Sequence, residues 1–346
     1  MGSILVNGMP FCPRGSHADG ILADLAAFLQ DWHADTPTME LYTSGSTGTP
    51  KTITVTKEAM MAGARATCRA FGLQEGDSAL LCLPLRYIAG KMMVVRALVG
   101  GLNLVTAEPC STPLAKINAP VDFAPLVPMQ ALTTLQQPNG MAQLEKARII
   151  LLGGGFVDAA LETALQSCQS AVYASYGMTE TLSHIALRRI NGEHATPYYT
   201  PLPQVSVRLS PRGTLALSVP YLGIEDMETN DLAEILPDGR FRILGRADSV
   251  INSGGIKIQA ETIEQALTAA TGLQVMAVPM PHPILGQAVG LLWEGATEKE
   301  TALQQAIQAL PKYHQPHKVQ HHTLPRTATG KVNRAAGTAF MIDKTC

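Results

Sequence analysis

The sequence predicts an α/β protein with a large domain of layered α/β sheets and a β-rich subdomain, followed by a small α+β domain. Three observations support this prediction. Apolar strand-like runs alternate with amphipathic helices in the first half, a pattern typical of parallel sheets. Short alternating strands separated by turn residues follow. The chain of 346 residues suits two or three domains at roughly 100–200 residues each.

The first half begins with a helix at 20–34, whose apolar residues recur at helical spacing. Strands and helices then alternate. Strands are predicted at 39–44, 52–56, 78–84, 102–106 and 148–152, and helices at 57–71 and 90–100. The last of these strands ends in three glycines.

The pattern changes near residue 203, where strands are predicted at 204–210, 214–219, 233–237 and 241–245. The turn sequences PRG and PDG separate them. Beyond a polar stretch come a helix at 260–270, a strand at 273–278 and a helix at 298–310. We therefore expect a large domain at 1–245, a linker at 246–248 and a small domain at 249–346.

Composition excludes several classes of protein. The formal net charge is −2 and no long basic block occurs, so nothing indicates nucleic-acid binding. No apolar run approaches the ~18–20 residues of a membrane span, and the N-terminus lacks a secretory pattern. The six cysteines are scattered without a C-x-x-C pair, which indicates reduced thiols and a cytoplasmic protein.

The strongest chemical signal is the segment Thr43-Ser44-Gly45-Ser46-Thr47-Gly48-Thr49-Pro50-Lys51. Its glycines permit close backbone approach, and its hydroxyls, amides and lysine can bind phosphate oxygens. It nearly fits a P-loop, but Pro50 replaces the final glycine and a β-branched run follows where a helix is needed. By itself the segment could also be an ordinary polar hairpin loop.

Four further segments occur in order: YGMTET at 176–181, TND at 229–231, GRAD with SGGIKI at 245–258, and PRTATGK at 325–331. Together with the 43–51 segment they resemble the adenylate-forming superfamily of acyl-CoA synthetases, peptide-synthetase adenylation domains and luciferases. The resemblance covers nearly all of the chain. It implies that a carboxylic acid is activated as an acyl-adenylate and then transferred to a thiol.

The resemblance also implies roles for particular residues, with ATP, Mg²⁺ and CoA as the cofactor and co-substrates. Phosphate binding would fall to Thr43, Ser44, Gly45, Ser46, Thr47, Gly48 and Lys51, aided by Thr179. Glu180 would ligate Mg²⁺, and Lys331 would neutralise charge at the α-phosphate. The adenosine would contact Gly153, Gly154, Gly155, Ser175, Tyr176, Gly177, Asp231 and Arg246. Taken singly, Glu180 could be a solvated acid at a helix start, Asp231 a turn residue and Lys331 a surface lysine.

The same resemblance places a hinge at Asp248. The small domain would swing about it, withdrawing Lys331 and bringing in a loop for the CoA arm formed by Ser253, Gly254, Gly255 and Lys257. Such a motion would separate the two half-reactions.

Two segments would border the acyl pocket, 84–90 and 181–184. PLRYIAG resembles the PLYHISG of o-succinylbenzoate–CoA ligases of menaquinone biosynthesis. Tyr87 takes the histidine position of that motif. Because that substrate has a second carboxylate, a cation or several donors must bind it, and the candidates are Arg86, Lys91 and His184. Arg86 and Lys91 could instead be surface charges, and His184 a hydrogen-bonded helix residue. Two alternatives are open. The protein could be a ligase for another aryl or acyl acid, delivering it to CoA or to a carrier-protein thiol, or it could be a non-catalytic nucleotide-binding member of the fold. A homo-oligomer is left open. Only 42 residues precede the phosphate loop, whereas family members usually have well over a hundred.

Overall fold

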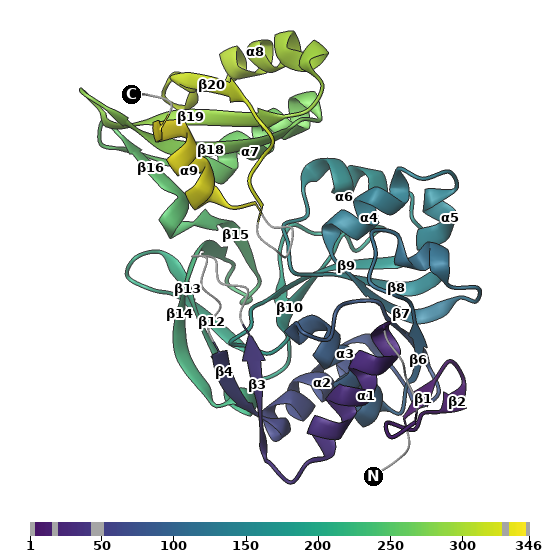
Figure 1. Ribbon diagram of the computed structural model, residues 1–346. Helices are drawn as coiled ribbons and strands as arrows, with labels where there is room; N and C mark the ends of the chain where they lie inside the picture. Colours follow the sequence, from purple (N-terminus) through teal and green to yellow (C-terminus); the bar gives the residue numbers. More distant parts are fainter. Residues whose placement is uncertain (1–3, 16–19, 43–51, 327–331, 344–346) are drawn as a thin grey trace.

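The computed structural model describes residues 4–15, 20–42, 52–326 and 332–343. Its largest sheet in this part of the chain has the strand order β11-β10-β9-β8-β7-β5-β6-β1-β2 (Figure 1). The strands are β1 Leu5–Val6, β2 Met9–Pro10, β5 Ser78–Leu81, β6 Asn103–Thr106, β7 Val121–Leu126, β8 Ala147–Leu152, β9 Ala171–Gly177, β10 His184–Arg189 and β11 Thr200–Pro201. The strands from β1 to β9 along this order pair in parallel, and β2, β10 and β11 are antiparallel at its ends.

Helices cover both faces of this sheet (Figure 1). One layer consists of α1 Gly20–His33, α2 Lys57–Phe71 and α3 Ile88–Gly100, and the other of α4 Pro128–Leu135, α5 Gly140–Leu144 and α6 Ala159–Leu165. The continuous apolar run of β8 follows from this arrangement. Ile149 and Leu151 belong to the core beneath the first layer, and Ile150 and Leu152 to the core beneath the second. A strand buried on both faces needs apolar residues at every position.

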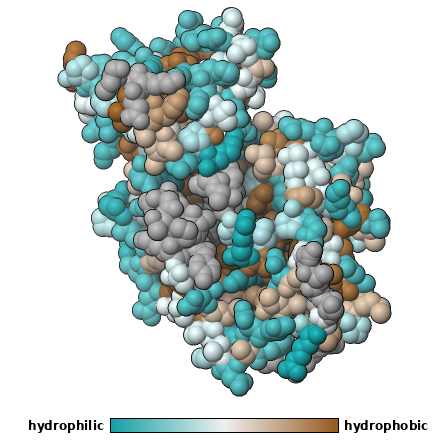
Figure 2. All heavy atoms as spheres, in the orientation of Figure 1, coloured by the Kyte–Doolittle hydropathy of each residue, from teal (hydrophilic) through white to brown (hydrophobic). Residues whose placement is uncertain are grey.

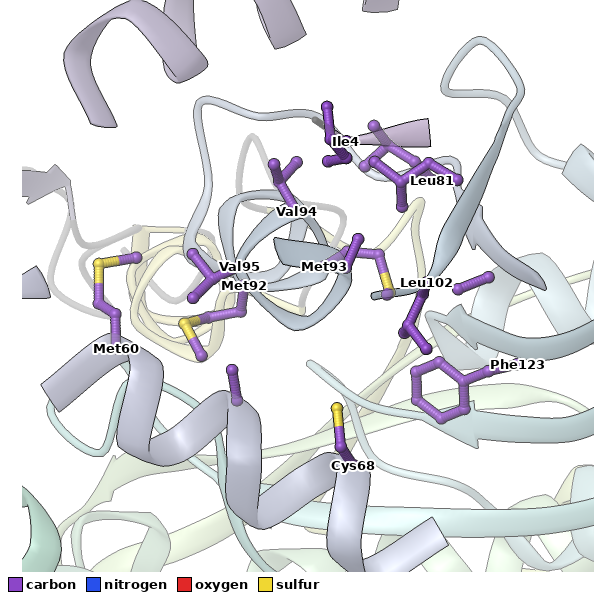
Figure 3. Close-up of a cluster of buried hydrophobic side chains, with 14 of the residues drawn as sticks. Ile4, Met60, Cys68, Leu81, Met92, Met93, Val94, Val95, Leu102 and Phe123 are labelled. Carbon is purple, nitrogen blue, oxygen red and sulfur yellow. The ribbon is translucent and has the colours of Figure 1, made fainter. Parts of the chain in front are cut away.

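Helices α2 and α3 pack against each other through Met60 and Cys68 on one side and Met92 and Val95 on the other (Figure 3). The start of α2 is set by Thr56, whose side chain accepts a hydrogen bond from the amide of Ala59 at 3.1 Å. The α2–α3 layer lies directly after the β3–β4 ribbon, formed by β3 Thr38–Tyr42 and β4 Thr52–Thr56.

A four-stranded antiparallel sheet follows the large sheet. Its strands are β12 Ser206–Leu209, β13 Thr214–Val219, β14 Ile224–Ile235 and β15 Phe241–Arg246. The two predicted turns are present, with Gly213 and Gly239 in the left-handed region at φ of 77° and 84°. Strand β14 is longer than the strand predicted at 233–237. The prediction missed its first half because exposed acidic residues there obscure the apolar alternation.

The C-terminal part has its own sheet and its own cores. After the short 3₁₀ turn η3 Ala247–Ser249, the strands are β16 Val250–Ser253, β17 Ile256–Gln259, β18 Gln274–His282, β19 Gly286–Glu294 and β20 Lys318–His321. The helices are α7 Ala260–Thr271, α8 Glu300–Ala309 and α9 Arg334–Asp343. The α/β fold class predicted from the sequence is confirmed.

No helix in the described ranges is long and apolar enough to cross a membrane. Among the described residues, Cys68, Cys82, Cys110 and Cys168 are free thiols. Apolar surface is divided into small patches among hydrophilic residues on the face seen in Figure 2.

An ion-pair cluster holds α9 on α7. The Arg334 guanidinium contacts both carboxylate oxygens of Glu264, one of them at 3.0 Å, and Glu261 at 3.4 Å. All three side chains are less than one quarter exposed. Removing one partner from such a cluster leaves buried charge without compensation.

We therefore expect Arg334→Met to lower the free energy of unfolding of the C-terminal part by about 3 kcal/mol, measured by urea denaturation. Arg240→Met is the matched control, because Arg240 pairs with Asp238 on the surface and exposed pairs contribute little. Equal losses in the two variants would show that the Arg334 cluster is not a specific stabilising contact.

Candidate active site

The predicted nucleotide-binding residues gather where the parallel strands end. Strand β8 ends at Leu152 and continues into Gly153, and β9 ends at Gly177. The carboxyl edge of a parallel sheet is the usual place for a ligand, since backbone groups and loops converge there.

The glycine segment after β8 permits close contact with β9. A Cβ atom on Gly153 would lie 2.7 Å from Ser175 Oγ, which itself donates to the Leu152 carbonyl at 3.0 Å. Gly154 adopts a left-handed φ of 73°, and both Gly154 and Gly155 are exposed. The segment therefore presents bare backbone at the edge of the sheet, suited to a flat ligand.

A cluster of three polar side chains joins the large sheet to the β-rich subdomain. The Tyr176 hydroxyl donates to Asp231 Oδ2 at 2.5 Å, and Arg246 Nη1 lies 3.5 Å from Asp231 Oδ1. Asp231 and Arg246 are register partners on β14 and β15, which explains how residues fifteen apart meet. Burial, together with the Asp231 charge, raises the pKa of Tyr176 above its ordinary value, so the phenol stays a donor.

The Tyr176 ring is fixed by aromatic neighbours. It meets the Phe241 ring edge-on, with 5.3 Å between ring centres, and its centre lies 5.9 Å from that of the Tyr199 ring. Its position at the end of β9 therefore depends on β15 and on the loop before β11. The ring, the Asp231 carboxylate and the Arg246 guanidinium together offer an apolar face, an acceptor and a donor, which suits a nucleoside.

The loop after β9 is held by Thr181. This buried hydroxyl accepts from the Met178 amide at 2.9 Å and also contacts the Met178 and Ser183 carbonyls at 3.1 and 2.8 Å. Gly177 is required here, since a Cβ would lie 2.4 Å from the Ser183 carbonyl oxygen. The constrained turn leaves Thr179 half-buried and Glu180 exposed.

Glu180 is suited to a hard cation carried by a ligand. A single exposed carboxylate cannot enclose a metal, but it can complete the shell of Mg²⁺ bound to phosphates. Within the described ranges no group of three or more His, Cys, Asp or Glu could hold a metal ion.

Several predicted residues lie outside the described residues: Thr43, Ser44, Gly45, Ser46, Thr47, Gly48, Lys51 and Lys331. The described residues beside them form paired backbone. Tyr42 and Thr52 are register partners at the ends of β3 and β4, and Arg326 and Val332 form an isolated bridge. The strand β4 after the first segment agrees with the argument against a P-loop, which needs a helix there.

The predicted hinge residue lies between the β-rich sheet and the C-terminal sheet, and the predicted CoA-side residues lie on the first two strands of the C-terminal sheet and the turn between them. Asp248, in η3, accepts two hydrogen bonds from Arg246 at 2.8 Å each, which lowers the pKa of the Asp248 carboxyl. Gly254 and Gly255, both left-handed at φ of 59° and 87°, form the turn from β16 to β17. Ser253 before the turn is buried, and Lys257 after it is exposed.

The four predicted acyl-pocket residues differ in exposure and in contacts. Arg86 is exposed, with its guanidinium 4.8 Å from the ring centre of Tyr87. Lys91 donates to the Glu40 carbonyl on β3 at 3.3 Å. His184 is buried, only 7% exposed, at the start of β10. Arg86 and Tyr87 therefore share one environment, and Lys91 and His184 have others.

The structure adds an arginine that the sequence reasoning missed. Arg96 lies in the middle of the apolar helix α3, only 4% exposed, and donates from Nη2 to Ser183 Oγ at 2.6 Å. Its buried Nε has no hydrogen-bond partner among the described residues. Burial lowers its pKa to about 10. The signal in the sequence was a single cation inside the run MMVVRALVG.

His184 is neutral beside this arginine. Burial, and then the Arg96 charge, lower the pKa of His184 to about 3. Its ring also meets Phe71 edge-on at 6.0 Å.

Comparison with known proteins assigns the family. The model of the AMP-binding enzyme family matches residues 15–215, which is more than half of the chain, so the chain belongs to this family. An acyl-CoA synthetase (AMP-forming)/AMP-acid ligase II-like protein from Dyadobacter fermentans is 35% identical, over 95% of this chain and 96% of that one, with a TM-score of 0.65.

Two further similarities concern ligases with a named acid. The 2-succinylbenzoate–CoA ligase of Staphylococcus aureus is 29% identical over 328 residues, 85% of this chain and 65% of its own. The chain thus spans about two thirds of the length of this curated relative. O-succinylbenzoate CoA synthetase from Bacillus subtilis, solved with ATP and magnesium ion, has the same fold at 22% identity and a TM-score of 0.70, over 86% of this chain and 68% of that one.

The low pKa of His184 predicts a dependence of stability on pH. Unfolding restores an ordinary pKa near 6.5, so below that pH the unfolded state binds a proton that the folded state does not. The contribution of the neutral His184 to the free energy of unfolding is therefore present above pH 6.5 and is lost as the pH decreases toward 3. Between about pH 7.5 and pH 5.5 this contribution amounts to about 1.4 kcal/mol.

Between the same two pH values, the free energy of unfolding of His184→Gln should fall by about 1.4 kcal/mol less than that of the wild type. Urea denaturation of both proteins at both pH values measures this difference. The difference between the two proteins removes the contributions of the other histidines. Identical pH slopes would contradict a neutral, buried His184.

Proposed function

We propose that the protein is an AMP-forming acid–thiol ligase that uses ATP, Mg²⁺ and CoA, and that its acid is o-succinylbenzoate. In the first half-reaction an acid oxygen attacks the α-phosphate and pyrophosphate leaves. In the second, the CoA thiol attacks the acyl carbon and AMP leaves. Positioning and charge neutralisation dominate such chemistry.

The nucleotide half of the proposal is supported by the cluster at the end of β9. Asp231 would accept from the ribose hydroxyls, Arg246 would donate beside it, and Tyr176 would lie against adenine, next to Ser175 and the glycines after β8. Glu180 would hold Mg²⁺ together with the phosphates, where the metal neutralises negative charge. The 43–51 segment and Lys331 would act on the phosphates.

The acid half is supported by one observation, the buried Arg96. An uncompensated guanidinium within an apolar layer is costly unless an anion pairs with it. Its Nε is unpaired and its neighbour Ser183 belongs to the 181–184 segment. A dicarboxylic acid supplies the missing partner, because one carboxylate can react while the other binds Arg96. The named acid of the Staphylococcus aureus relative has this property.

The second half-reaction would use the C-terminal part. The 245–249 segment would act as the boundary and hinge, and rotation would break the Arg246–Asp248 pair observed here. Ser253, Gly254, Gly255 and Lys257 would then face the CoA arm, since two left-handed glycines leave room beside the backbone. The free thiols support a reducing compartment such as the cytoplasm.

Acid-dependent ATP–pyrophosphate exchange tests the proposal. We expect exchange with o-succinylbenzoate, weak exchange with its analogue esterified at the non-reacting carboxylate, and little with fatty acids, followed by thioester formation with CoA. Exchange with simple aryl acids but not the diacid would assign a different substrate. A protein that binds ATP and exchanges with no acid would be a nucleotide-binding member of the fold.

Arg96→Met tests the proposed anion site. We expect the KM for the diacid to rise by roughly 30-fold or more, since a buried charge-assisted contact contributes about 2 kcal/mol or more, with a much smaller change in the KM for ATP. Steady-state exchange kinetics measure both constants. If Arg86→Met produces this loss instead, the anion site lies at the exposed Arg86.

A further inference from the structure

A continuous chain of buried and partly buried hydrogen bonds leads from α2 to Arg96. On α2, the Thr67 hydroxyl donates to the Gly63 carbonyl at 3.2 Å. A hydroxyl has one hydrogen, and with that hydrogen on the Gly63 carbonyl, Thr67 Oγ1 is the acceptor at its contact with His184 Nε2, 3.4 Å away. We assign this arrangement, which places the His184 proton on Nε2.

The other ring nitrogen of His184 is then a lone-pair acceptor. Ser183 Oγ lies 3.4 Å from Nδ1 and donates its hydrogen to it. The lone pairs of Ser183 Oγ remain for Arg96 Nη2, which donates at 2.6 Å. In this arrangement the bonds run in one direction, from Arg96 through Ser183, His184 and Thr67 to the carbonyl of Gly63.

This chain of hydrogen bonds lies in a layer whose other side-chain contacts are mainly apolar. Thr67 is fully buried and His184 is 7% exposed. Around them α2 and α3 pack through Met60, Cys68 and Met92 (Figure 3). Polar groups in such a layer lose their hydration, and a connected set in which each donor has an acceptor orients its members strongly.

We infer that Thr67 and His184 are positioning residues that orient Ser183 and Arg96 for the non-reacting carboxylate of a dicarboxylic acid, and so set the preference for diacids over monoacids. This inference rests on the proposed function. Ser183 holds Nη2 at 2.6 Å, whereas the buried Nε has no hydrogen-bond partner among the described residues, so a planar anion that enters beside Nε would complete the hydrogen bonds of the guanidinium. A neutral His184 is essential, because an imidazolium would lose the acceptor at Nδ1.

The test is the ratio of kcat/KM for o-succinylbenzoate to that for its monoester in ATP–pyrophosphate exchange. Thr67→Val keeps the shape and removes the acceptor, so the ratio should fall by about tenfold, mainly through the KM of the diacid. Thr67→Ser restores the hydroxyl and should recover most of the ratio. Recovery by serine separates positioning from packing, since serine lacks the methyl group.

Thr134→Val is the matched control. Thr134 is also fully buried and also donates to a carbonyl one turn earlier, that of Gln130 at 2.7 Å, but it lies on α4 in the opposite layer. The ratio should keep its wild-type value. A wild-type ratio in Thr67→Val together with a collapsed ratio in Arg96→Met would overturn the positioning role while leaving Arg96 as the anion site.

The tautomer of His184 is read separately by nitrogen-15 NMR of the protein without substrate. We expect the proton on Nε2 in the wild type and a loss of this preference in Thr67→Val. A proton on Nδ1 in the wild type would overturn the hydrogen-bond chain whatever the enzyme activates. Absence of diacid exchange with the expected tautomer would instead overturn the proposed function, and the diacid preference with it.

Discussion

Burial of the parallel sheet on both faces is the constraint on which the rest of the structure depends. Strand β8 contributes alternate residues to two different cores, so its interior has no place for a polar side chain. Chemistry is therefore confined to strand ends and to the elements that cross them. The glycines after β8 and the Tyr176–Glu180 segment after β9 both follow this rule.

Arg96 departs from the rule, and the departure is informative. A guanidinium in the middle of α3, within an otherwise apolar layer, must be oriented by neighbours that also give up water. The Thr67, His184 and Ser183 side chains supply these contacts from two other elements. The cost of burying the group makes a structural role without an anion a poor explanation.

The adenosine side of the site depends on a different principle, the joining of two sheets. Tyr176 comes from the large sheet, whereas Asp231 and Arg246 come from adjacent strands of the β-rich sheet. Arg246 is shared between Asp231 and Asp248. Its position links the nucleotide residues with the η3 segment that leads to the C-terminal sheet.

The sequence by itself determined the fold class, many of the element positions and the order of the nucleotide motifs, but it did not locate strands β7, β9 and β10. These features are local, since hydrophobic periodicity and turn residues are encoded over a few positions. The strands at 148–152 and 241–245 and the helix at 260–270 were predicted within a residue or so. The full length of β14 was missed because its acidic residues obscure the alternation.

Only the tertiary structure decided which side chains share an environment. It showed that Arg86 is exposed and His184 buried, although the sequence had grouped both as acyl-pocket candidates, and it brought Arg96 next to Ser183 from 87 residues away. Spacing in the sequence cannot reveal such a contact, because it depends on how α2 and α3 pack over β10. The burial that lowers the pKa values of Arg96 and His184 arises from that packing and from nothing within either segment.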